Sequence, residues 1–177
     1  MHYLLFLDRI VPRREMNNMS LVEVKNLKKV YTSKLGTNGV VALRDVNFNV
    51  ERGEYVAVMG ESGSGKTTLL NILAALDRAS SGEVILDGMN LSAIRDGEIS
   101  AFRRDNLGFV FQDFNLLDTF TLRDNIYLPR VLAGAKPSQM EAELKLIAEY
   151  LGITHILDKF PYEVSGGQKQ RAAVARA

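Results

Sequence analysis

A glycine- and serine-rich stretch has the residue types and spacing expected of a phosphate-binding loop. It reads Gly60-Glu61-Ser62-Gly63-Ser64-Gly65-Lys66-Thr67, with Thr68 next, and so fits the spacing of Gly, four residues, Gly, Lys and then Ser or Thr. The glycines let backbone N–H groups curl around phosphate oxygens, and the first amides of a following helix add a positive end. The Lys66 ammonium then reaches the β- and γ-phosphates, and the Thr67 hydroxyl is offered to Mg²⁺. The alternative interpretation of this stretch is a flexible turn that Lys66 and Thr67 follow by chance.

Two apolar patterns flank this loop and are expected to position it. Tyr55-Val56-Ala57-Val58-Met59 is a continuous apolar run, which is typical of a strand buried on both faces. Lys66 to Leu76 has apolar residues at helical spacing, namely Leu69, Leu70, Ile72, Leu73 and Leu76. The sequence therefore predicts a strand, the loop and a helix in succession, which is the context that such a loop requires.

A second anion-binding pattern lies farther along the chain. Ser165, Gly166, Gly167 and Gln168 open a helical pattern that runs to Ala177. A serine hydroxyl and two glycines at a helix N-terminus form a site that could receive a γ-phosphate from outside the first loop. Taken alone, this pattern is also compatible with a well-capped helix after a glycine turn.

Together these motifs resemble those of the ATP-binding-cassette (ABC) ATPases. Tyr162-Glu163-Val164-Ser165-Gly166-Gly167-Gln168-Lys169-Gln170-Arg171 is similar to the family signature L-S-G-G-Q, with Val164 in place of Leu. Phe109-Val110-Phe111-Gln112-Asp113 resembles the Q-loop, whose glutamine approaches the metal and the nucleophilic water, and Tyr31 matches the aromatic residue that stacks on adenine. By themselves, Gln112 is compatible with a solvated loop residue and Tyr31 with an ordinary strand tyrosine.

The resemblance implies an α/β fold: a P-loop NTPase core with an N-terminal antiparallel β-subdomain and an α-helical subdomain. Residues 19–111 would form the β-subdomain and the first part of the core, and residues 112–177 the Q-loop, the helical subdomain and the start of the signature helix. Lys66 and Gln112 would be catalytic, and Thr67 and Gln112 would hold Mg²⁺. The implied ATP-binding residues are Tyr31, Gly60, Ser62, Gly63, Ser64, Gly65, Lys66, Thr67 and Thr68, with Ser165, Gly166, Gly167 and Gln168 acting in trans.

The sequence departs from the family pattern in the residues that support hydrolysis. A hydrolysing cassette has, after the signature helix, a buried strand ending in Asp-Glu (Walker B) and then a histidine, and neither follows the signature in these 177 residues. Val84-Ile85-Leu86-Asp87 continues into Gly88, which is typical of a hairpin turn, and His2 and His155 both precede the signature. We therefore expect that the C-terminal part of the core is missing, that ATP is turned over slowly or not at all, and that an edge of the sheet is uncovered.

The remaining elements follow from periodicity and turn signals. The sequence predicts half-buried strands between Leu21 and Val50 around a Gly36-Thr37-Asn38-Gly39 turn, and further strands at residues 84–86 and 107–111. It predicts helices near residues 96–104 and over 121–133, with a kink at Pro129, 137–151 and 165–177. Residues 1–18 sustain no period, and we interpret them as a non-native leader with translation starting at Met19.

Composition excludes several classes of protein. The 177 residues are 46% hydrophobic and 24% charged with a formal net charge of +1, which is globular composition without the basic excess of a nucleic-acid-binding protein. The absence of cysteine excludes disulfides and thiolate zinc sites. No run approaches the roughly 18 to 20 apolar residues that span a bilayer. A cytoplasmic protein is expected.

A narrower resemblance concerns the transported substrate. Three segments look like the corresponding segments of ATPase subunits of bacterial exporters of the bacitracin-resistance type, which are relatives of the lipoprotein-releasing and macrolide-efflux ATPases. The segments are Phe102-Arg103-Arg104, residues 107–118 and residues 124–129. This implies an integral-membrane permease and a second cassette in a homodimer as partners, on the inner face of the cell membrane, and a peptide antibiotic or lipid-linked substrate. Phe114, Leu116 and Leu117 are either permease contacts or core residues.

Two other functions compete with this one. A non-catalytic ATP-binding remnant of a truncated gene remains open from the sequence. A small P-loop kinase is disfavoured by the strands that precede the loop and by the signature near the C-terminus.

Overall fold

The computed structural model describes residues 3–6, 20–32 and 39–177. It divides into two compact units, one covering Leu7–Asn106 and the other Met1–Phe6 with Leu107–Ala177. The proposed start at Met19 and residues 36–38 of the Gly-Thr-Asn-Gly turn lie outside the described residues.

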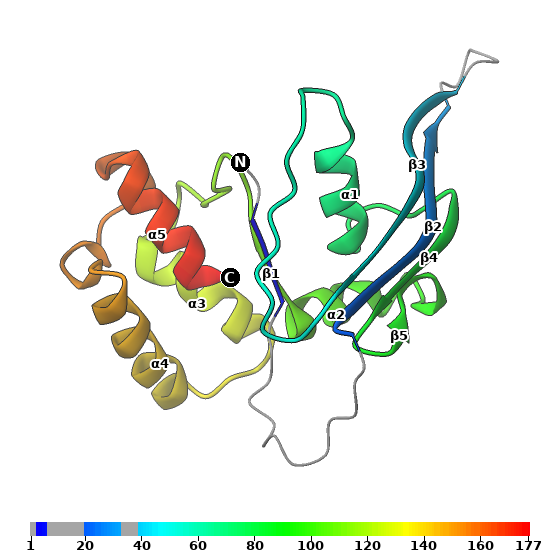
Figure 1. Cartoon of the computed structure of the whole chain (residues 1–177). Helices are drawn as coiled ribbons and strands as arrows, with labels where there is room; N and C mark the ends of the chain where they lie inside the picture. Colours follow the sequence, from blue (N-terminus) through cyan, green and yellow to red (C-terminus); the bar gives the residue numbers. More distant parts are fainter. Residues whose placement is uncertain (1–2, 7–19, 33–38) are drawn as a thin grey trace. The chain divides into compact units, whose positions relative to one another are not determined.

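The Leu7–Asn106 unit contains a four-stranded antiparallel sheet (Figure 1). Its strands are β2 (Val22–Tyr31), β3 (Val40–Val50), β4 (Ser81–Leu86) and β5 (Met89–Asn90), in the order β3-β2-β4-β5. Alternate residues at the start of β2 are buried, and a short hairpin joins β4 to β5 through Asp87 and Gly88, both at positive φ. The predicted antiparallel sheet and hairpin are therefore confirmed.

Helix α1 (Lys66–Leu73) packs Leu69, Ile72 and Leu73 into the interior of the same unit. It is shorter than the predicted helix over residues 66–76, because Ala75 has a φ of 53° and ends the helical path. A 3₁₀ turn, η1 (Leu91–Ala93), and α2 (Ile99–Asn106) complete this unit. Helix α2 confirms the helix predicted near residues 96–104.

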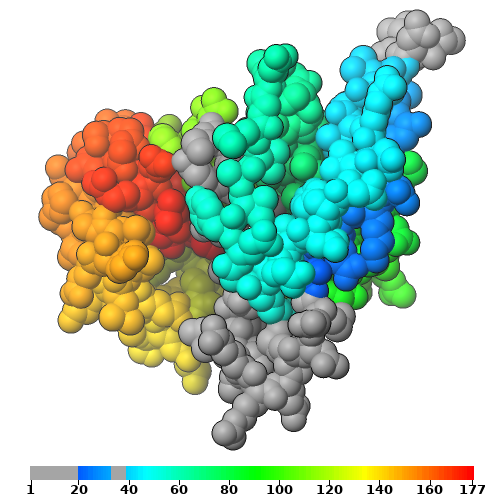
Figure 2. Space-filling model, in the orientation of Figure 1, coloured from blue at the N-terminus to red at the C-terminus, as the bar shows by residue number. Residues whose placement is uncertain are grey.

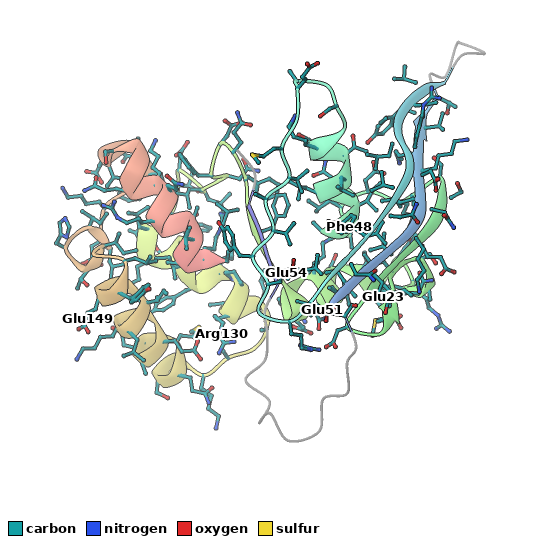
Figure 3. The ribbon with its side chains drawn as sticks, in the orientation of Figure 1. Glu23, Phe48, Glu51, Glu54, Arg130 and Glu149 are labelled. Carbon is teal, nitrogen blue, oxygen red and sulfur yellow. The ribbon has the colours of Figure 1, made fainter. Side chains whose placement is uncertain are left out.

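The strand predicted at Tyr55–Met59 is wrong for this structure. The segment has no assigned secondary structure, and Tyr55 and Met59 are 85% and 87% exposed. A tight turn precedes it, in which Glu54 N–H donates to Glu51 O at 3.2 Å and Glu51 N–H to the Glu54 carboxylate at 2.8 Å (Figure 3). A strand exists only where a neighbour satisfies its backbone groups, and no described strand pairs with this segment.

Helices dominate the second unit. They are α3 (Leu122–Leu132), α4 (Pro137–Tyr150) and α5 (Gly166–Arg176), with 3₁₀ turns η2 (Thr154–Ile156) and η3 (Pro161–Glu163). The three predicted helices are confirmed, and Pro129 lies inside α3. Ion pairs join α3 to α4 on the outside, such as that between Arg130 (labelled in Figure 3) and Glu143 at 2.5 Å. The apolar faces share a core of Leu122, Ile126, Leu144, Ala148, Ile153, Ile156, Leu157 and Ala172.

A two-stranded antiparallel sheet belongs to the same unit. β6 (Leu107–Val110) confirms the predicted strand, and β1 (Tyr3–Phe6) pairs with it from Tyr3 opposite Val110 to Phe6 opposite Leu107. The leader was expected to have no regular structure, so β1 corrects that expectation for four of its residues. The edge of β6 supplies unpaired backbone groups that an extended segment can satisfy.

Candidate nucleotide-binding site

The loop between Tyr55–Met59 and α1 has the backbone shape of an anion cradle. Gly60, Gly63 and Gly65 have φ values of 154°, 81° and 90°. At Gly65 a side chain is excluded by space as well as by φ, because a Cβ atom would lie 2.5 Å from Ala42 O and 2.9 Å from the Leu43 side chain. The start of α1 is thereby brought tightly against β3.

The Lys66 ammonium closes this loop from inside. It donates to Gly60 O at 2.9 Å, to Glu61 O at 2.5 Å and to Ser64 Oγ at 3.2 Å. All three are neutral oxygens of exposed residues, so phosphate oxygens can replace them as stronger, charge-assisted partners. Figure 2 shows the segment on the molecular surface, where a ligand can reach it.

The N-terminus of α1 is available to an anion. Its N-cap, Gly65, makes no side-chain capping hydrogen bond, and the first turn holds no acidic residue. The first amides and the helix dipole therefore favour a negative group at this point. Thr67 is exposed beside them, and its hydroxyl is a hard oxygen of the kind that suits Mg²⁺. Ser62 and Ser64 are exposed in the loop, and Thr68 is half-buried behind it.

Tyr31 ends β2 in the same unit as the loop. Its side chain is 42% exposed, and its hydroxyl donates to Asp77 Oδ2 at 2.8 Å. The Lys29 ammonium lies 4.8 Å from the ring centroid. The ring is thus a partly exposed aromatic surface with a fixed edge, as a base-stacking residue requires.

Gln112 is exposed just beyond β6, at the start of an irregular loop. In that loop Phe114 and Asn115 have φ values of 62° and 45°. The Arg176 guanidinium, at the end of α5, donates to Phe114 O at 2.7 Å and to Asn115 O at 2.6 Å. Burial lowers the pKa of Arg176, yet a guanidinium stays protonated in proteins.

Asn125 fixes the other end of this loop from α3. It is fully buried, accepts from Leu117 N–H at 2.7 Å, and donates to the carbonyls of Leu117, Phe120 and Thr121. Phe114 and Leu116 are half-buried, Leu116 against the helical core, whereas Leu117 is 42% exposed. Leu116 is therefore a core residue, whereas Leu117 stays a candidate for contact with a partner.

The signature residues form a capped and exposed helix start. Ser165 Oγ accepts from Gln168 N–H at 3.4 Å, and Gln168 Oε1 accepts from Ser165 N–H at 2.9 Å. Ser165, Gly166 and Gly167 are exposed, and nothing lies within 4 Å of a Cβ built at Gly166. This leaves room for a ligand approaching from outside, while the side-chain oxygen of Gln168 is hydrogen-bonded in the helix cap.

The predicted site residues fall into two groups. Tyr31 and residues 60–68 belong to the Leu7–Asn106 unit, and Gln112 and Ser165–Gln168 to the other. Within the second unit, the loop after Gln112 is bound to the C-terminal end of α5, and the signature is at its N-terminal end (Figure 1). Sequence reasoning missed Lys29, Asp77, Asn125 and Arg176, and only the placement of Lys29 two residues before Tyr31 on one strand face hinted at a role.

A family profile described as ABC transporter matches residues 43–177, which is most of the chain. The chain belongs to the ABC transporter family. The matched range includes residues 60–68, Gln112 and residues 165–168, and the α/β fold agrees with the family.

Several curated relatives support the same assignment. An uncharacterized ABC transporter ATP-binding protein of Bacillus subtilis, YvcR, is 52% identical over 90% of this chain and 61% of its own. The bacitracin export ATP-binding protein BceA of Halalkalibacterium halodurans is 44% identical over 90% of this chain and 62% of its own. A macrolide export ATP-binding/permease protein of Neisseria meningitidis is 43% identical over 90% of this chain and 24% of its own. The chain thus spans about three fifths of the first two relatives.

A solved structure shows the same fold. The ATP-binding cassette MJ0796, in a dimeric post-hydrolysis state bound to ADP and Pi, matches with a TM-score of 0.79 at 37% identity, over 88% of this chain and 68% of that one.

Across the part of the chain that the structure describes, no helix is long and apolar enough to cross a membrane.

Proposed function

We propose that this chain is the ATP-binding part of the ATPase subunit of a bacterial ABC exporter. The observation that carries the proposal is the loop at Gly60–Thr67, whose lysine ammonium and uncapped helix N-terminus converge on one exposed cradle. Membership of the ABC transporter family supports ATP as the ligand. The solved relative bound to ADP and Pi supports a nucleotide at the same fold.

The residues divide the work of binding between base and phosphates. Lys66 exchanges its loop oxygens for those of the β- and γ-phosphates, and the first amides of α1 hold the phosphates by hydrogen bonds. Tyr31 stacks on the adenine. The hydroxyl of Thr67 and the amide of Gln112 would be the protein ligands for Mg²⁺, which would neutralise negative charge on the phosphates. Ser165, Gly166, Gly167 and Gln168 face the γ-phosphate held by a second cassette.

The partners follow from this division of the site. A second copy of the cassette completes each ATP site in a homodimer, as the dimeric state of MJ0796 supports. An integral-membrane permease holds the dimer at the cytoplasmic face of the membrane. The similarity to the bacitracin export ATP-binding protein supports a peptide antibiotic as the transported substrate. Stimulation of the ATPase of the whole protein with its permease by bacitracin, but not by a macrolide, would support that class over the macrolides.

Calorimetric titration of the purified chain with MgATP tests the central claim. Since hydrogen bonds to charged groups contribute about 1.5–3 kcal/mol, Lys66→Ala should weaken binding about 10- to 150-fold. Lys145→Ala, which removes an exposed lysine of α4, is the matched control and should bind as the parent does. Equal affinity of the parent and Lys66→Ala would contradict the proposal.

A phosphate-release assay tests turnover by these 177 residues. We expect binding without steady hydrolysis, because the acidic pair and histidine of the family pattern do not follow the signature in this sequence. A steady rate that disappears in Lys66→Ala would overturn this part of the proposal while leaving ATP binding intact.

A further inference from the structure

Asp77 lies at the centre of a hydrogen-bonded group around Tyr31. One carboxylate oxygen accepts from the Tyr31 hydroxyl at 2.8 Å, and the other from the Lys29 ammonium at 2.6 Å and the Arg78 N–H at 2.7 Å. Lys29 also donates to Arg78 O at 2.7 Å, and its side chain is only 12% exposed. The tyrosine edge is therefore held by an ionised carboxylate that is itself fixed from two sides.

Asp77 is in turn fixed to the helix that begins at the phosphate-binding loop. The backbone N–H groups of Leu76 and Asp77 both donate to Asn71 O of α1, at 2.8 and 3.2 Å. The left-handed Ala75 turns the chain back so that these bonds form. Since α1 has eight residues, it spans about 12 Å between the loop and this turn.

The chain after Asp77 is bound to β2 as well. Ser80 N–H donates to Lys28 O at 2.9 Å, and Val30 N–H donates to Ser80 Oγ at 3.0 Å. The end of α1 and the end of β2 therefore form one rigid connection, with Asp77 and Lys29 as its side-chain part.

We infer that Asp77 and Lys29 are positioning residues that set the Tyr31 ring at a fixed place relative to the phosphate-binding loop. The inference rests on the proposed ATP binding. The ammonium of Lys29 covers one face of the ring, so a base stacks on the opposite face. Asp77 holds the hydroxyl and so fixes the rotation of the side chain. The geometry therefore favours ligands that carry both an aromatic base and a polyphosphate, with the two parts at the spacing that α1 sets.

Two probes separate the base from the phosphates: MgATP, and inorganic tripolyphosphate with Mg²⁺. Stacking of a base on an aromatic residue contributes about 1–3 kcal/mol, so Tyr31→Leu should weaken MgATP binding about 5- to 150-fold and leave tripolyphosphate binding unchanged. Asp77→Ala should weaken MgATP binding several-fold, again without change for tripolyphosphate. Asp77→Asn keeps an acceptor for Tyr31 and should recover most of this loss.

A double variant tests the connection itself. Tyr31→Phe keeps the ring and removes the hydroxyl, so combining it with Asp77→Ala should weaken MgATP binding no more than Asp77→Ala alone. Asp96→Ala is the matched control, since it removes an exposed aspartate whose partner is the Arg78 side chain. The affinities of Asp96→Ala for MgATP and for tripolyphosphate should equal those of the parent.

The outcomes distinguish this inference from the proposed function. Equal loss of MgATP and tripolyphosphate binding in both Asp77→Ala and Asp77→Asn would show a merely structural role and overturn the inference alone. Unchanged MgATP affinity in Asp77→Ala would do the same. A parent chain that binds neither probe would overturn the proposed function, and the inference with it.

Discussion

At the residue scale, the phosphate-binding loop depends on glycines at positive φ, a backbone conformation that strains other residues. Gly65 is the sharpest example, because positive φ and close packing coincide there. Gly53 has a similar φ of 77°, but nothing lies within 4 Å of a Cβ built on it. Comparing substitutions at Gly65 and Gly53 therefore separates the cost of the backbone conformation from the cost of the steric clash of a Cβ atom.

We expect Gly65→Ala to lose both stability and phosphate binding, and Gly53→Ala to lose less stability and no phosphate binding. A left-handed conformation costs an alanine about 1–2 kcal/mol, and Gly65→Ala adds the clash with Ala42 O. Urea denaturation and tripolyphosphate titration measure the two effects. Similar losses for both variants would show that packing against β3 does not matter.

The ionisation of Asp77 predicts a dependence of stability on pH. Partial burial raises the pKa of Asp77, but the hydrogen bonds from Lys29, Tyr31 and the Arg78 N–H together outweigh it, so the pKa lies below its ordinary value. A lowered carboxyl pKa stabilises the fold above the unfolded-state value of about 3.9, and this contribution is lost as the pH falls through the folded-state pKa. As the pH falls through and below that unfolded-state value, the unfolding free energy of the parent should fall more steeply than that of Asp77→Asn. Parallel curves would show that the carboxylate contributes nothing.

At the element scale, side-chain to backbone hydrogen bonds decide how the irregular segments lie. The loop after Gln112 has no regular structure, yet Arg176 holds one end to α5 and Asn125 holds the other to α3. A capping box of Thr121 and Asp124 then starts α3 directly after the loop. The loop is thereby part of the helical unit despite its lack of secondary structure.

Removing the guanidinium should release this loop. In Arg176→Met the carbonyls of Phe114 and Asn115 lose a charged donor, and the unfolding free energy should fall by roughly 2–3 kcal/mol. Hydrogen exchange should accelerate at residues 111–118 more than in the core of α4. Arg176→Lys, which keeps one cationic donor group, should show a smaller effect. Unchanged exchange in this loop would contradict the role given to Arg176.

At the scale of the whole molecule, an apolar segment stays uncovered. Tyr55, Val56, Val58 and Met59 are 85%, 48%, 39% and 87% exposed, in a segment that no described strand pairs with. Contiguous exposed apolar residues of this kind promote association with other chains.

We therefore expect the isolated 177-residue chain to self-associate with increasing concentration. Replacing Tyr55 and Met59 together by lysine should shift the sedimentation profile towards monomer, while the same change at the exposed Ser92 and Thr119 should not. A parent chain that is monomeric at all concentrations would show that the segment is covered in solution.

The sequence by itself determined what depends on neighbours along the chain. The glycine spacing of the phosphate-binding loop, the Ser165 cap, the hairpin at Asp87-Gly88 and the helical periods are local. The structure agrees with each, except that α1 ends at Leu73, before the predicted end of its helix. Tertiary structure alone decided the pairs that are distant in sequence, such as Tyr31 with Asp77 and Arg176 with Phe114. It also decided against the strand at Tyr55–Met59, since an apolar run becomes a strand only where another strand lies beside it.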